Sequence, residues 1–180
     1  MKWLNCFVLT CCVLFSVAPQ KLAADTILEG RLSQKELASR YAWFEEGKQK
    51  YVPDENTVQA LLPYSRHLRF IVVMGTWCSD SQMHVPRFFK LMGALQIPEE
   101  RIELIGVDRK KQCSKADLSA LHVGYVPTFV VLYQGKEVGR IVENPEVSLE
   151  QDLLQMLRNT PASGDGRLPG TSEFKANSTD

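Results

Sequence analysis

The sequence has no excess of charge of either sign, no long hydrophobic run and little glycine, proline or cysteine. Its 180 residues carry 21 basic and 21 acidic side chains, so it lacks the basic surface typical of nucleic-acid-binding proteins. No apolar run reaches the roughly 20 residues that a membrane helix needs. The 11 glycines and 9 prolines are too few for a fibrous or mostly disordered chain. These absences leave a globular domain with a core of its own.

Residues 1–24 have the layout of a secretory signal peptide. A basic start is followed by the apolar run Cys6–Ala18 and then by small residues up to Ala24, where we expect cleavage. The mature protein would then be secreted or periplasmic, with no membrane attachment. The less favoured alternative is a lipoprotein signal through Cys11 or Cys12, because the residues that precede these cysteines are not the small ones such signals use.

Hydrophobic periodicity and capping signals divide the rest of the chain into three parts. The capping boxes begin at Ser33 and Ser148. Residues 25–67 are predicted to form an N-terminal helical extension, with helices at 33–49 and 54–62. Residues 68–158 are predicted to form an α/β domain with strands at 68–74, 102–107, 128–133 and 138–142 and helices at 79–95, 114–121 and from 149 onward. Residues 159–180 are rich in Pro, Gly, Ser and charge and are predicted to be a flexible tail.

Cysteine is the residue most indicative of chemistry, because removal of residues 1–24 leaves only Cys78 and Cys113. Two cysteines are too few for a disulfide framework. Cys78 lies in Gly75-Thr76-Trp77-Cys78-Ser79-Asp80-Ser81, between a predicted buried strand and a predicted helix. The unpaired N–H groups and the positive dipole end of that helix favour a thiolate. Cys78 is therefore a candidate nucleophile. The alternative is a buried, inert cysteine.

These motifs resemble the thioredoxin family over residues 68–158. Trp77-Cys78 follows a hydrophobic strand, Cys78-Ser79-Asp80-Ser81 opens a helix, and Pro86 lies within that helix. Gly124-Tyr125-Val126-Pro127-Thr128 precedes the third strand, as the cis-proline loop of that family does. The resemblance implies a thioredoxin-like α/β fold, a mixed sheet with helices on both faces.

The resemblance also implies how substrate would be held. It places a cis Val126–Pro127 bond opposite the nucleophile Cys78. The backbone of Val126 would pair with an extended substrate, and Trp77 would form an apolar rim beside the thiol. The structural alternatives are an ordinary strand-entry proline at position 127 and a core tryptophan at position 77.

Ser81 departs from the family pattern, because the second cysteine of the motif is absent. Ser81 cannot resolve a mixed disulfide, although it would donate a hydrogen bond to the Cys78 thiolate or cap nearby N–H groups. Val72 stands where reductases of the family usually carry a buried acid, which is consistent with the loss of the second thiol. We therefore expect thiol–disulfide exchange by a monothiol route. The alternative is a catalytically weakened binding module for extended peptides or thiol proteins.

Cys113 is a candidate resolving thiol outside the motif. It follows the strand 102–107, which is expected to run parallel to the strand before Cys78, so its loop emerges on the same side of the sheet. The alternative is a free cysteine packed against the next helix. His84 follows Ser81 by one helical turn, and we expect it to be a surface histidine rather than a catalytic one.

Expected partners are protein or low-molecular-weight thiols and disulfides. The cysteines and the three histidines show no metal-ligand spacing, so we expect no metal. No phosphate-binding glycine loop is present, and we expect no cofactor.

Overall fold

A five-stranded mixed sheet lies at the centre of the computed structural model, which describes residues 26–160. The strand order is β1-β3-β2-β4-β5, with β2 and β3 parallel and every other neighbouring pair antiparallel. The strands are β1 (Gly30–Leu32), β2 (Leu68–Met74), β3 (Ile102–Gly106), β4 (Thr128–Tyr133) and β5 (Lys136–Val142). The α/β class and the four predicted strands are confirmed. The signal peptide with its cleavage site, and the tail beyond residue 160, lie outside the described residues.

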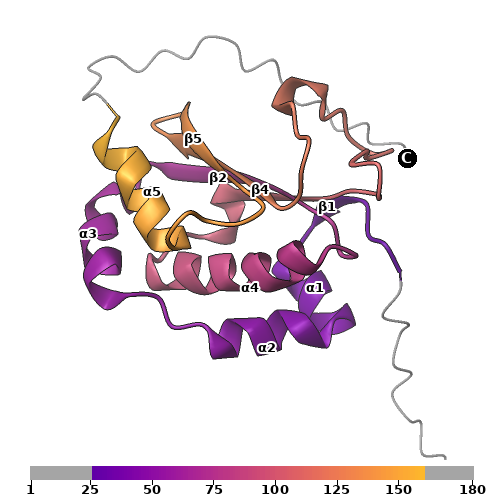
Figure 1. The fold of residues 1–180 in the computed structure, drawn as a ribbon, viewed down its shortest axis with the longest axis horizontal. Helices are drawn as coiled ribbons and strands as arrows, with labels where there is room; N and C mark the ends of the chain where they lie inside the picture. Colours follow the sequence, from indigo (N-terminus) through magenta and orange to yellow (C-terminus); the bar gives the residue numbers. More distant parts are fainter. Residues whose placement is uncertain (1–25, 161–180) are drawn as a thin grey trace, which may run out of the picture.

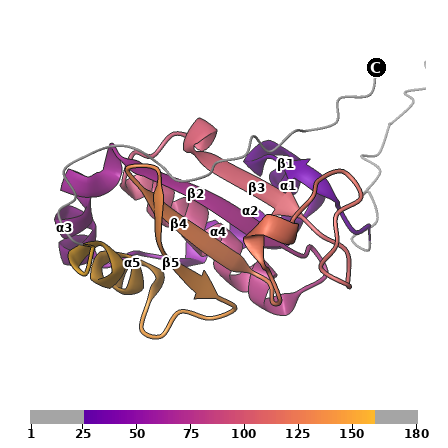
Figure 2. The ribbon, with the colours of Figure 1, turned by 90° about the horizontal axis from the view of Figure 1, so that it is seen from above.

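Within residues 26–160, five α-helices pack on one face of this sheet. They are α1 (Gln34–Arg40), α2 (Ala42–Lys50), α3 (Glu55–Ser65), α4 (Ser79–Ala94) and α5 (Leu149–Arg158). Figure 1 shows α4 directly beneath the sheet with α2 below it, and Figure 2 gives the view from above. Alternate residues of β2, among them Phe70 and Val72, enter the same hydrophobic cluster as the apolar side chains of these helices. No helix within residues 26–160 is long and apolar enough to cross a membrane.

Helices were predicted on both faces of the sheet. This is wrong for the described residues, because all of their α-helices lie on one face. The second face carries a smaller cluster around Val73, Val107 and Val126, covered by the segment 108–125. That segment contains only the short 3₁₀ helix η2 (Ser119–Leu121) in place of the predicted helix 114–121. The carboxylate of Asp108 accepts hydrogen bonds from the backbone N–H groups of Lys110 and Gln112. The carboxylate of Asp117 accepts a hydrogen bond from the backbone N–H of Ser119. Such side-chain bonds stabilise turns in competition with a helix.

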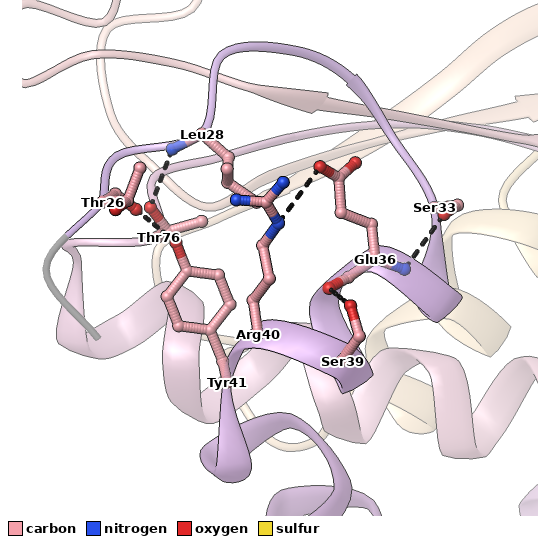
Figure 3. Close-up of polar contacts among 8 residues, drawn as sticks. All are labelled: Thr26, Leu28, Ser33, Glu36, Ser39, Arg40, Tyr41 and Thr76. Atoms are coloured by element: carbon pink, nitrogen blue, oxygen red, sulfur yellow. Dashed lines mark hydrogen bonds and ion pairs between the residues drawn. The ribbon is translucent and has the colours of Figure 1, made fainter. Parts of the chain in front are cut away.

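The predicted helix 33–49 is two helices that meet at Tyr41. The Ser33 cap forms as expected, since its Oγ accepts from the N–H of Glu36 at 3.1 Å. Tyr41 is extended, and its hydroxyl donates to the carbonyl of Thr26 (Figure 3). This long-range contact and the burial of the Tyr41 ring explain a break that helical periodicity did not reveal. The next helix was predicted to end before Pro63 but continues through it to Ser65.

Strand β1 was not predicted. It has three residues, too few to show a period, and it pairs antiparallel with β3 through Gly30 and Gly106. Just before it, the N–H of Leu28 donates to Oγ1 of Thr76 at 3.3 Å (Figure 3). A Cβ on Gly106 would lie 2.3 Å from the carbonyl oxygen of Leu28. The N-terminal segment is therefore part of the sheet and is hydrogen-bonded to the loop that carries Cys78.

Candidate functional site around Cys78

Cys78 is held at the junction between β2 and α4. Its N–H donates to the carbonyl of Gly75 at 3.0 Å, which closes a turn after β2. The residue is the N-cap of α4 and is half-buried. Its Sγ lies 3.1 Å from the carbonyl oxygen of Val126, to which the thiol donates.

The loop 124–127, here called the cis-proline loop, lies opposite Cys78. The Val126–Pro127 peptide bond is cis, as the resemblance implies, and both residues are buried. The carbonyl of Pro127 accepts from the N–H of Glu143 at 2.7 Å. Within residues 26–160, no backbone carbonyl accepts from the N–H of Val126. The structure thus brings together Cys78, Val126 and Pro127.

Trp77 is half-buried beside the thiol and is fixed at both its edge and its face. Its indole Nε1 donates to the carbonyl of Val107 at 3.0 Å. The guanidinium of Arg109 lies 5.3 Å from the ring centroid, a cation–π arrangement. A Cβ on Gly75 would lie 2.6 Å from the ring, so only glycine leaves room for the indole at that position.

Ser81 is fully buried, and its side chain is hydrogen-bonded to the loop that precedes α4. Its Oγ accepts from the N–H of Gly75 at 3.2 Å. No hydrogen bond between Ser81 and Cys78 is found in the described part of the chain. The hydroxyl thus satisfies a backbone N–H, as the capping alternative expects, but one that lies in the preceding loop rather than in the helix.

Cys113 is a free, half-buried thiol on the same side of the sheet as Cys78. Both cysteines pack against the cluster of Val73, Val107 and Val126, and no disulfide joins them. Cys113 also lines an open hollow of about 730 Å³ together with Lys111 and His122. Cys113 therefore packs on the same cluster as Cys78 and borders an open hollow.

The prediction that His84 lies on the surface is wrong. Its side chain is only 4% exposed, and its Nε2 lies 2.9 Å from Oδ1 of Asn144. The Nδ1 atom has no hydrogen-bond partner among residues 26–160. Burial lowers the pKa of His84 below the usual value of a histidine. Asn144 is 60 residues away in sequence, so local patterns gave no signal of this pair.

Among the described residues, no group of three or more His, Cys, Asp or Glu side chains is arranged to hold a metal ion.

No family model matches the chain, and no curated protein matches it. One similar solved structure is a protein of unknown function from Pseudomonas aeruginosa, with 18% identity over 69% of this chain and 84% of that chain and a TM-score of 0.46. Another is an HIV epitope scaffold, with 17% identity over 71% of this chain and 86% of that chain and the same TM-score. Neither similarity assigns a family or a function.

Proposed function

We propose that this protein is a secreted or periplasmic thioredoxin-like protein that exchanges thiols and disulfides through the single nucleophile Cys78. The observation that carries the proposal is the contact between Cys78 at the N-terminus of α4 and the carbonyl of Val126 beside cis Pro127. The parallel β2–β3 pair, followed by the antiparallel β4–β5 hairpin, supports the thioredoxin-like assignment.

The first step is attack of the Cys78 thiolate on a disulfide R–S–S–R′. The new bond is Cys78–S–S–R, and R′S⁻ leaves with the electron pair of the broken bond. An extended substrate would lie along the cis-proline loop, where the N–H of Val126 has no backbone acceptor among residues 26–160 and Trp77 forms the rim. Ser81 cannot take the next step, because it has no thiol.

A second thiol completes the exchange in one of two ways. An outside thiol R″SH attacks the substrate sulfur, which releases the Cys78 thiolate and forms R–S–S–R″. Alternatively, Cys113 attacks the Cys78 sulfur, which releases RS⁻ and leaves a Cys78–Cys113 disulfide that an outside dithiol must reduce. The shared packing of both cysteines supports Cys113 as the resolving residue.

The alternative function is a binding module that retains the groove without turnover. This alternative is favoured by Ser81, which is buried and hydrogen-bonded to Gly75 and provides no second thiol. Insulin reduction by dithiothreitol distinguishes the two functions. Turnover that depends on Cys78 supports exchange, and peptide binding without turnover supports the module.

The direct test is the rate of alkylation of each cysteine by iodoacetamide, followed by peptide mass spectrometry from pH 5 to 9. We expect Cys78 to react at least several times faster than Cys113, because the N-terminus of α4 stabilises its thiolate. Cys78→Ser should abolish insulin reduction while Cys113→Ser retains the first attack. Equal alkylation rates at both cysteines would contradict the nucleophile assignment.

The role of Cys113 has a separate test. We expect mild oxidation of the mature chain to give a Cys78–Cys113 peptide pair in an unreduced digest, and Cys113→Ser to accumulate the mixed disulfide with substrate instead. If the wild-type chain keeps both thiols free under these conditions, an outside thiol resolves every turnover.

A further inference from the structure

His84 and Asn144 join two segments that both lie at the candidate site. His84 is on the second turn of α4, the helix that Cys78 caps. Asn144 lies just beyond β5 and is exposed. With Oδ1 of Asn144 facing Nε2 of His84 at 2.9 Å, the neutral imidazole carries its proton on Nε2 and donates it, because an amide oxygen only accepts.

The turn at residues 143–144 also contacts the cis-proline loop. Glu143 has a left-handed backbone with φ of +59°, and its N–H donates to the carbonyl of Pro127 at 2.7 Å. The carbonyl of the preceding residue, Val126, accepts from Cys78. These contacts form a closed ring that runs from Cys78 through the cis-proline loop to the turn and returns through His84 to α4.

The ring is compatible with an uncharged imidazole. His84 is 4% exposed, and its Nδ1 has no partner in residues 26–160, so a second proton would be buried without an acceptor. The charged groups that act on His84 are Arg87 and Asp80, both on α4. The group that faces it from the turn, Asn144, is neutral. The side chain therefore acts as a hydrogen-bond donor rather than as an ion pair.

We propose that neutral His84 is a positioning residue, which holds the turn at Glu143–Asn144 and, through it, the cis-proline loop against Cys78. Its effect on disulfide exchange rests on the proposed function, whereas its effect on the order of the turn rests on the contacts alone. Loss of the His84 donor frees the turn, the carbonyl of Pro127 loses its fixed partner Glu143, and the carbonyl of Val126 loses its fixed place opposite the sulfur.

Amide hydrogen exchange of the mature chain at pH 7.5, measured by mass spectrometry, tests the proposal. His84→Leu removes the donor and keeps an apolar side chain in place, His84→Gln retains an N–H, and His67→Gln alters an exposed histidine as a control. We expect His84→Leu to speed exchange of the Glu143 amide by roughly fivefold to tenfold, the effect of one lost hydrogen bond. His84→Gln should restore most of the protection. Equal protection in His84→Leu and His67→Gln would overturn the proposal.

Two further measurements separate this inference from the proposed function. In His84→Leu, we expect reaction of Cys78 with a peptide disulfide to slow by a similar factor, while alkylation by the small reagent iodoacetamide stays within twofold. If the wild-type chain does not exchange disulfides but His84→Leu still loosens the turn, only the proposed function fails. If the wild-type chain exchanges disulfides and His84→Leu changes neither rate nor protection, only the positioning role fails. Should His84→Leu not fold, Asn144→Ala removes the acceptor at an exposed position and carries the same expectation.

Discussion

Under the proposed function, Ser81 occupies the position at which a dithiol enzyme would carry its second cysteine. The hydroxyl is fully buried and accepts from the N–H of Gly75. The serine thus helps fix the loop that carries Trp77 and Cys78. Ser81 therefore provides no resolving thiol, but its hydroxyl helps hold the loop at the site in place.

Ser81→Cys tests this geometry directly. The spacing of three residues at the start of α4 permits a disulfide with Cys78, so we expect an internal disulfide under mild oxidation and higher insulin-reductase turnover. The reduced variant should lose about 1 kcal/mol of stability, because sulfur is a weak acceptor for the N–H of Gly75. The checks are thiol titration, intact mass and urea unfolding. An internal disulfide would leave Cys113 as the one free thiol of the mature variant, whereas three free thiols after oxidation would show that the site lacks the geometry of a dithiol motif.

Among the elements, α4 has the largest role, since Cys78 caps its N-terminus and His84 lies on its second turn. Its outer side packs against α2 at a close approach. A Cβ on Gly47 of α2 would lie 2.8 Å from two ring carbons of Pro86 on α4. The proline ring is rigid, so the two helices would have to separate to admit a methyl group.

We therefore expect Gly47→Ala to destabilise the protein by about 1–3 kcal/mol, the usual range for overpacking, although alanine is the better helix former. Gly93→Ala on α4 is the matched control, because nothing lies within 4 Å of its added Cβ. That variant should be neutral or more stable by up to about 1 kcal/mol. Urea unfolding of both variants gives the comparison, and equal stabilities would contradict the close contact.

In the whole molecule, contacts distant in sequence tie the N-terminal segment to the site. The N–H of Leu28 donates to Thr76, two residues before Cys78. The buried carboxylate of Glu150 on α5 accepts from the hydroxyl of Tyr51 and from the N–H of Asp54. Residues 26–67 therefore belong to the same cooperative structure as the sheet, and we expect one unfolding transition.

The buried His84 gives this unfolding a dependence on pH. Burial lowers its pKa in the folded protein, so the unfolded chain binds the proton first, below about pH 6.5. The stability that neutral His84 contributes is complete above that pH and is lost as the pH falls through the lower folded-state value. We expect the unfolding free energy of the wild type to fall more steeply with acid than that of His84→Gln. Parallel curves from urea unfolding between pH 7.5 and 4.5 would rule out this linkage.

The sequence by itself determined the helices and strands whose hydrophobic pattern or cap is formed by residues close together in the chain. The β-branched run Leu68–Met74 is a strand at the predicted bounds, and the caps at Ser33 and Ser148 form as expected. The resemblance carried by the motifs at Cys78 and Pro127 indicated which two loops meet, and the structure brings them together.

The tertiary structure decided the rest, because those features depend on partners far apart in sequence. Leu28 and Thr76 are 48 residues apart, and His84 and Asn144 are 60 apart, distances that helical and strand periods do not encode. The segment 108–125 has turns and the short 3₁₀ helix η2 in place of the predicted α-helix, because Asp108 and Asp117 bind backbone N–H groups locally. The apolar side chains of Leu118, Leu121 and Val123 pack against the sheet from this irregular backbone. Local propensity is overridden where burial and side-chain hydrogen bonds favour another backbone.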